Sequence, residues 1–230
     1  MTIDLVVENL SVHYGGVRAV SNLSVTVPAG TCTALLGANG AGKTSALRGI
    51  GGLTKASGQV TLAGERLDHL PASGRAGAGL GHVLEGRHVF PGLTVAENIE
   101  VARRRARHEL KADPLELLPE LRPHLDRPAG GLSGGQQQML AIARAVAGGP
   151  QAVMLDEPTN GLSPKLVNRT IDIIADLRDA GFAVLLVEQR LEVAQALEAE
   201  VLVLRHGATE HRGVGTDADL PDLLHSMYLS

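Results

Sequence analysis

Short apolar runs recur along the chain and alternate with longer stretches in which the apolar residues follow helical spacing. The runs "TALLG", "AVMLD", "AVLLVE" and "VLVLR" are apolar at successive positions, which is typical of strands buried on both faces of a parallel sheet. Helical stretches separate these strands, most clearly the stretch after Pro164. The alternation predicts an α/β fold in which helices cover both faces of a parallel sheet.

Two of the helical stretches have well-defined apolar faces. The helix after Pro164 is expected to end at Gly181 and to bury a face formed by Leu166, Thr170, Ile171, Ile174 and Leu177. A second helix is expected to have Ser133 as its N-cap residue and to bury Met139, Leu140, Ile142, Ala143 and Val146. Residues 94–146 as a whole predict a separate helical lobe, broken by Pro114, Pro119, Pro123 and Pro128.

The N-terminal part of the chain reads as β-structure. "IDLVVENL" and "LSVTVPAG" are β-like runs bounded by turns, and "SGQVTLAGERL", from Ser57 to Leu67, predicts a short hairpin. The glycine-rich stretch "PASGRAGAGLG" then leads to a strand that is expected to end near Leu84.

Composition and charge narrow the possible functions. The 230 residues, 44% of them hydrophobic, can form one domain or one domain with an inserted lobe. Lys and Arg number 21 against 25 Asp and Glu, a net charge of −4 that disfavours a broad nucleic-acid surface. The basic stretch "ARRRARH" at 102–108 is interpreted as a solvated helical face, because no aromatic residues interleave it.

The sequence lacks the patterns expected for a disulfide framework, a metal cluster or a membrane-spanning segment. Cys32 is the only cysteine, and the nine histidines show no paired ligand spacing. No apolar run approaches the roughly 18 residues of a membrane span, and the N-terminus lacks the pattern of a signal peptide. We therefore expect a cytoplasmic chain that reaches a membrane only through a partner.

The segment "GANGAGKT", Gly37 to Thr44, fits the pattern G-x-x-x-x-G-K-[ST] between a strand and a helix. In such a loop the backbone N–H groups curl around phosphates, Lys43 should reach the β and γ oxygens, and Thr44 should ligate Mg²⁺. The predicted nucleotide-binding residues are Gly37, Asn39, Gly40, Ala41, Gly42, Lys43, Thr44 and Ser45.

Two carboxylates follow the buried run "AVMLD". Asp156 and Glu157 should lie at the carboxyl edge of the parallel sheet, where ligands bind in this class of fold. Asp156 can hold Mg²⁺ directly or through water, and Glu157 can then polarise a water molecule for attack on a γ-phosphate. We predict that the pair serves nucleotide hydrolysis.

The segment "LSGGQ" precedes the helix that begins near Ser133. One hydroxyl is enough to cap a helix, so capping does not explain Gly134, Gly135 and Gln136. Unpaired N–H groups and the positive end of the helix dipole suit an anion. We predict that a negatively charged group binds here.

In this order, "GANGAGKT", "LSGGQ" and "VMLDEP" resemble the motifs of the ATP-binding subunit of ABC transporters, and the resemblance covers nearly the whole chain. It implies a single ATP-binding domain over residues 1–230 with a P-loop NTPase (RecA-like) parallel-sheet core. An N-terminal antiparallel β subdomain and that core would occupy about 1–90 and 150–230, with an inserted helical subdomain at about 91–149.

The resemblance also implies a dimer that hydrolyses two molecules of ATP with Mg²⁺. Ser133, Gly134, Gly135 and Gln136 of one subunit would contact the γ-phosphate held by the other, Tyr14 would stack on adenine, and "TNGLSPK" would cross the interface, with Ser163 where many members have aspartate. The partner ATPase would be a second copy or a related subunit. Membrane permease subunits would hold the pair at the inner face of the membrane, with a substrate-binding protein contributing indirectly and nucleic acid playing no part.

Two positions resemble one branch of this family, the second ATPase subunit of branched-chain amino acid importers and its urea-importer relatives. Glu85 stands where most members have a glutamine that links the nucleotide to the membrane subunit, and Gln189 stands where most have a histidine. By the same resemblance, Glu85 would join Thr44 and Asp156 at the Mg²⁺ ion. The final "MYLS" also fits this branch. We expect import of branched-chain amino acids, with urea or another small solute as the alternative.

Gln189 changes the expected chemistry. Its amide can donate a hydrogen bond to a γ-phosphate but cannot take up a proton near neutral pH, as histidine can. Our hypothesis is that Gln189 positions phosphate and water while Glu157 is the base and Lys43 binds the phosphate. A soluble ABC-type ATPase is the other reading, but such proteins normally need a long coiled coil or two nucleotide domains, and neither is evident here.

Overall fold

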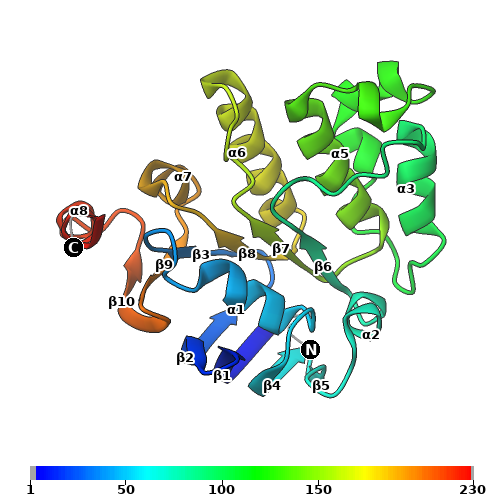
Figure 1. Cartoon of the computed structure of the whole chain (residues 1–230). Helices are drawn as coiled ribbons and strands as arrows, with labels where there is room; N and C mark the ends of the chain where they lie inside the picture. Colours follow the sequence, from blue (N-terminus) through cyan, green and yellow to red (C-terminus); the bar gives the residue numbers. More distant parts are fainter. Residues whose placement is uncertain (1–3, 229–230) are drawn as a thin grey trace.

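Two β-sheets organise the chain in the computed structural model, which describes residues 4–228 (Figure 1). The larger sheet has the strand order β10-β9-β3-β8-β7-β6, and every neighbouring pair is parallel except β9 with β10. Its strands are Cys32–Leu36 (β3), Leu80–Val83 (β6), Ala152–Asp156 (β7), Ala183–Val187 (β8), Glu200–Arg205 (β9) and Ala208–Val214 (β10). Leu229 and Ser230, the end of "MYLS", lie outside the described residues.

Burial explains the parallel core. All residues of β3, β7 and β8 are buried, as the continuous apolar runs require, whereas exposed and half-buried positions alternate along β10 at the edge. The predicted α/β class, with a parallel sheet at its centre, is confirmed.

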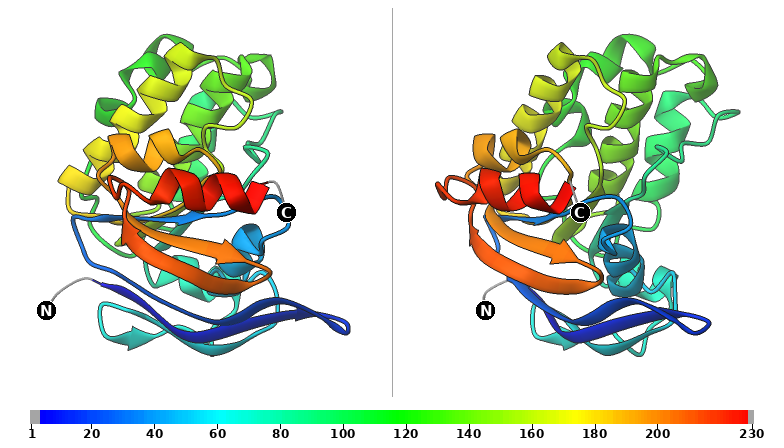
Figure 2. Two further views of the ribbon diagram at one scale, coloured as in Figure 1. Left: turned by 90° about the vertical axis from the view of Figure 1, so that its left-hand side faces the viewer. Right: turned by 60° about the vertical axis from the view of Figure 1, so that its left-hand side comes forward.

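The smaller sheet is antiparallel and has the order β2-β1-β4-β5. Its strands are Leu5–Tyr14 (β1), Val17–Val27 (β2), Ala56–Leu62 (β4) and Glu65–Arg66 (β5), so the hairpin predicted between Ser57 and Leu67 is present. Figure 2 shows this sheet below the larger one, with helix α1 (Lys43–Ile50) between the two. Leu47 and Ile50 of that helix share one core with Val7 of the small sheet and Leu185 of the large one.

Among the remaining helices, Ala72–Gly77 (α2) lies against the end of α1, and the others cover the other face of the large sheet or form the lobe beside it (Figure 1). These others are Val95–Arg103 (α3), Pro114–Leu117 (α4), Gly134–Ala147 (α5), Pro164–Asp179 (α6), Leu191–Ala196 (α7) and Leu220–Tyr228 (α8), with 3₁₀ segments at Pro119–His124 and Ala129–Gly131. None of the helices in the described part of the chain has the length and apolar character needed to cross a membrane.

The buried face expected from the sequence is fully confirmed for one of the two helices and only partly for the other. All five apolar positions predicted for α5 are buried, whereas on α6 only Thr170, Ile174 and Leu177 are, joined by Val167 and Ile173. Leu166 and Ile171 are half-buried. Leu166 points to the start of α5, where its side chain fills the space beside Gly135, so it does not cover the sheet.

The prolines of the helical lobe begin helices more often than they break them. Pro114 and Pro119 are the first residues of α4 and of the first 3₁₀ segment, a position that needs no backbone N–H. The interpretation of "ARRRARH" as a solvated helical face holds for solvation, since its arginines are exposed, but the helix was wrong beyond Arg103, where α3 ends and an irregular segment begins.

Helix α2 was not predicted, because its glycines hide the pattern, and Arg75 explains why the segment is ordered. The Arg75 side chain is 7% exposed and lies against the end of α1. Its guanidinium donates hydrogen bonds to the carbonyls of Gly49 (3.0 Å), Ile50 (2.6 Å), Leu70 (3.0 Å) and Asp68 (3.0 Å). One buried side chain therefore satisfies the last carbonyls of α1 and joins α2 to it.

Replacing Arg75 by Met should lower the free energy of unfolding by about 2–4 kcal/mol, because several buried carbonyls lose their partners. Urea denaturation of the purified chain measures this loss. Arg66→Met is the matched control, since Arg66 is exposed and pairs only with Asp68, and it should change stability little. Equal midpoints for the two variants would contradict the assigned role of Arg75.

Candidate functional site

The phosphate-binding loop predicted from "GANGAGKT" connects β3 to α1. Gly42 is the N-cap residue of α1 with φ +105° and no side-chain cap, so the first N–H groups of the helix remain open to a ligand. A Cβ at Gly42 would lie 2.3 Å from the carbonyl oxygen of Ala19, and one at Gly37 would lie 2.4 Å from that of Leu204. These two positions therefore need glycine for close approach of the backbone.

Lys43 is the first residue of α1 and is 4% exposed. Its Nζ donates hydrogen bonds to the carbonyls of Gly37 (2.8 Å) and Ala38 (3.1 Å) and is 3.8 Å from Oε1 of Glu157. Burial lowers the pKa of Lys43, and the nearby carboxylates of Glu157 and Asp156 oppose that shift. A bound phosphate would add negative charge beside the buried ammonium and so hold it in its charged form.

Thr44 and Asp156 form the part of the site that fits a divalent cation. Thr44 Oγ1 donates to Asp156 Oδ1 at 3.0 Å, while Asp156 Oδ2 is buried without a hydrogen-bond partner. Burial raises the pKa of Asp156 to about 6, partly offset by the bond from Thr44. A Mg²⁺ ion would give Oδ2 its partner and favour the ionised carboxylate.

The described residues contain no group of three His, Cys, Asp or Glu side chains placed to hold a metal by themselves. An ion at Thr44 and Asp156 would therefore take its other ligands from phosphate oxygens and water, as Mg²⁺ commonly does. Glu85, predicted as a further metal residue, lies beside Asp156 in the lining of a cavity of about 230 Å³.

Glu157 and Gln189 meet at the carboxyl edge of the sheet. Glu157 has a left-handed backbone conformation (φ +47°), held by its N–H, which donates to the carbonyl of Val187 at 3.0 Å. Its Oε1 accepts from Gln189 Nε2 at 2.8 Å, and its Oε2 accepts from Asn160 Nδ2 at 3.3 Å. A strained backbone fixed by several contacts is common at functional sites, since it holds a side chain in one direction.

These groups line one cavity of about 340 Å³. Its lining is formed by Ala19, Asn39, Gly40, Gly42, Lys43, Thr44, Ser45, Glu85, Glu157, Asn160 and Gln189. Gly37 and Ala41, which also belong to the loop, are buried and are not part of this lining. Tyr14 does not belong to this lining; it ends β1 at the tip of the β1–β2 hairpin and is 44% exposed. Sequence reasoning did not single out Asn160, although it follows Glu157 at the three-residue spacing of a turn.

The "LSGGQ" residues lie at the start of α5, outside the lining of that cavity. Ser133 is exposed and forms a capping box with Gln136: its Oγ accepts from Gln136 N–H at 3.4 Å, and its N–H donates to Gln136 Oε1 at 3.0 Å. A Cβ at Gly135 would come within 2.4 Å of Leu166, so close packing against α6 accounts for this glycine. A Cβ at Gly134 would meet the guanidinium of Arg87 at 2.7 Å.

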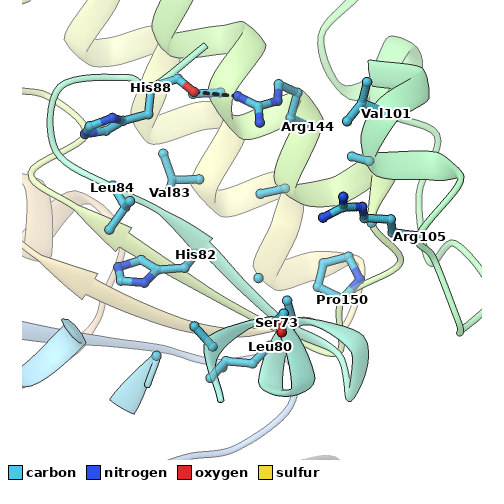
Figure 3. A pocket seen from close by; sticks show the side chains of 18 of the residues that line it. Ser73, Leu80, His82, Val83, Leu84, His88, Val101, Arg105, Arg144 and Pro150 are labelled. Carbon is cyan, nitrogen blue, oxygen red and sulfur yellow. Dashed lines mark hydrogen bonds between the residues drawn. The ribbon is translucent and has the colours of Figure 1, made fainter. Parts of the chain in front are cut away.

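A larger groove of about 710 Å³ lies between α2, β6, α3 and α5 (Figure 3). Apolar side chains such as Leu80, Val83 and Val101 form part of its wall, and Figure 3 shows Arg105 and Arg144 on the helical side. Arg144 donates to the carbonyl of His88 at 2.6 Å. The described lining contains five arginines and no carboxylate; the arginines are Arg87, Arg104, Arg105, Arg107 and Arg144.

Comparison with known proteins adds an independent line of argument. The sequence profile of a family described as "ABC transporter" matches residues 20–160. The chain is 39% identical to the high-affinity branched-chain amino acid transport ATP-binding protein BraG of Pseudomonas aeruginosa, over 87% of this chain and 88% of that protein. It is 36% identical to the probable branched-chain amino acid transport ATP-binding protein LivF of Archaeoglobus fulgidus, over 90% and 91%.

Among solved structures, the fold is similar to that of a bacterial ABC transporter cassette described as dimeric. The TM-score is 0.80 at 26% sequence identity, and the match covers 93% of this chain and 99% of the other.

The contact between Gln189 and Glu157 yields a testable expectation. Gln189→Ala should lower the turnover number for ATP about 10- to 100-fold, because the carboxylate of Glu157 and the γ-phosphate lose a positioning donor. The Michaelis constant should change little, since the phosphate loop is intact. Steady-state ATPase assays on the assembled transporter measure both quantities, and full activity of Gln189→Ala would refute the role. Asn160→Ala is the matched control for loss of a neighbouring donor to Glu157.

Proposed function

The chain belongs to the ABC transporter family as an ATPase subunit, and from that premise we propose that it closes with a second ATPase subunit around two ATP molecules to drive a membrane permease. The resemblance first seen in three short motifs is thereby confirmed at the level of the family. One observation supports the rest of the proposal. The chain has two elements suited to bind phosphate, and the loop at Gly37–Thr44 lines the nucleotide cavity, whereas the helix start at Ser133 does not.

In the proposed reaction, water attacks the γ-phosphorus, the bond to the β–γ bridging oxygen breaks, and Glu157 accepts the proton of the water. Lys43 and the open N–H groups of α1 bind the phosphates, and Gln189 holds Glu157 through its amide. Mg²⁺, held at Thr44 and Asp156, would neutralise charge on the phosphate oxygens. Each chain residue named here lines the cavity or, as with Asp156, adjoins it.

A second subunit would complete this site. The exposed hydroxyl of Ser133 accepts a hydrogen bond within its own chain but keeps its proton for a donor role, and the helix dipole favours an anion there. None of the five "LSGGQ" residues lines the cavity of its own chain, which supports the proposal that they contact a phosphate bound by another subunit. The partner is a second copy or a related chain.

We place the permease contact in the arginine-lined groove. The loop that carries Glu85 connects the two regions, because Glu85 lines the nucleotide cavity while Leu84 and Arg87 line the groove. Arg104 pairs with Glu100 at 2.9 Å, and the other four arginines of the lining favour an acidic segment of the membrane subunit. The apolar wall favours a partner with an apolar face. The chain would then sit at the inner face of the membrane through this contact.

The proposed cargo is branched-chain amino acids. BraG and LivF, which bear that description, match nearly the whole chain, and Glu85 and Gln189 fit the same branch. Urea or another small solute is the alternative. Cargo is selected by other subunits, so transport assays have to test it.

Replacing the proposed base should stop transport. Cells with Glu157→Gln as their only copy of the chain should lose uptake of labelled leucine and valine, because hydrolysis falls by about 100-fold or more. Expression should be matched to wild type. Loss of urea uptake alone would contradict the cargo while keeping the motor, and normal uptake of all three solutes would contradict the amino-acid and urea assignments.

Reversing charge in the groove should separate hydrolysis from transport. Arg105→Glu with Arg107→Glu should weaken assembly with the membrane subunits and reduce uptake about tenfold or more, because an acidic partner is repelled. ATP binding by the isolated chain should stay unchanged. Arg66→Glu, an exposed arginine outside the groove, is the control. Undiminished co-purification of the groove variant with the membrane subunits would contradict this docking surface.

A further inference from the structure

Glu188 is a buried carboxylate beside the site whose position the proposed reaction does not explain. It directly precedes Gln189, is 2% exposed, and follows the last residue of β8. Its backbone N–H donates to the carbonyl of Leu35 at 3.2 Å, which fixes it against β3. Burying a carboxylate is costly unless several donors compensate, so the surrounding contacts decide its role.

The carboxylate of Glu188 joins two segments that leave the sheet. Oε1 accepts hydrogen bonds from the hydroxyl (2.7 Å) and the N–H (3.2 Å) of Thr159, and Oε2 accepts from the N–H of Gln189 at 3.3 Å. Thr159 is itself 2% exposed. Burial raises the pKa of Glu188, and the bonds from Thr159 and Gln189 oppose that rise.

These bonds continue the β7–β8 pairing beyond the point where backbone pairing ends. The last ladder partners are Asp156 and Val187, followed by the bond from Glu157 N–H to the carbonyl of Val187. At the next residue, Glu188, the side chain instead of the backbone accepts the hydrogen bonds from the segment that follows β7. The turn that holds Glu157 and the loop that holds Gln189 are thus connected by one carboxylate.

The Thr159 end of this connection leads to the surface. Asn160 and Gly161 are exposed and precede α6, in the segment "TNGLSPK" that, by the resemblance of its sequence to the family, would cross the interface of the proposed dimer. The Gln189 end leads to Oε1 of Glu157 at 2.8 Å. Glu188 therefore lies between the surface that would meet the partner and the group that would activate water.

We propose that Glu188 is a positioning residue that couples the segment 159–163 to the Gln189–Glu157 contact, so that arrival of the partner subunit sets the geometry of the catalytic carboxylate. This inference rests on the proposed function and names the residue that would couple partner binding to hydrolysis. Glu188 does not touch the nucleotide cavity, whose described lining excludes it. Its effect on hydrolysis passes through Gln189.

Thr159 offers a matched pair of variants. Thr159→Val keeps the shape but removes the hydroxyl that donates to Glu188, whereas Thr159→Ser keeps the hydroxyl. In the assembled transporter, Thr159→Val and Glu188→Gln should each lower the turnover number about tenfold with the Michaelis constant within about twofold of wild type. Thr159→Ser should have a turnover number close to that of wild type. Equal activity of the Val and Ser variants would overturn the proposal.

A double-mutant cycle distinguishes coupling through Gln189 from a general loss of stability. In a Gln189→Ala background, Glu188→Gln should reduce turnover by less than about twofold further, because the element through which it acts is already gone. Multiplicative losses would overturn the proposal, as would a fall in the urea midpoint large enough to explain the lost activity. Failure of the proposed function would show separately, as a wild-type transporter that does not couple ATP hydrolysis to uptake.

Discussion

The site depends on the parallel pairing of β3, β8 and β7, which brings three distant parts of the chain to one edge of the sheet. The register sets Leu35 beside Val187 and Asp156 beside the same Val187, so the phosphate loop, the acidic pair and Gln189 all begin where these strands end. All three strands are fully buried, and their apolar packing fixes that edge. The side chains at this edge have well-defined positions because the buried strands that carry them have little conformational freedom.

Much of this arrangement could be predicted from the sequence. Continuous apolar runs identify the buried strands, and glycine, lysine and threonine at fixed spacing identify the phosphate loop, because each residue type answers a local requirement of backbone or ligand. Helix α2 escaped prediction since Arg75, a long-range contact to α1, orders a segment whose glycines suggest a loop. The buried position of Glu188 escaped for the same reason: only the fold shows that Thr159 is its partner.

The start of α5 illustrates how one motif serves two purposes. Gly135 is needed for packing against Leu166, and Ser133 with Gln136 closes a capping box, so part of "LSGGQ" has a structural explanation within one chain. Packing leaves one feature unexplained, the exposed Ser133 at a helix start that lies outside the lining of its own nucleotide cavity. In the proposed dimer each chain would form half of two composite sites, with Glu188 linking the surface of one half to its chemistry.

The composite site is tested most sharply by the mass in solution of Glu157→Gln with and without Mg-ATP, measured by sedimentation beside Glu157→Gln combined with Ser133→Arg. ATP should convert the first variant from monomer to dimer, or to a pair with its related ATPase subunit. The second variant should bind a fluorescent ATP analogue equally well yet stay monomeric. An ATP-saturated Glu157→Gln chain that pairs with neither, or a dimer that survives Ser133→Arg, would contradict the composite site.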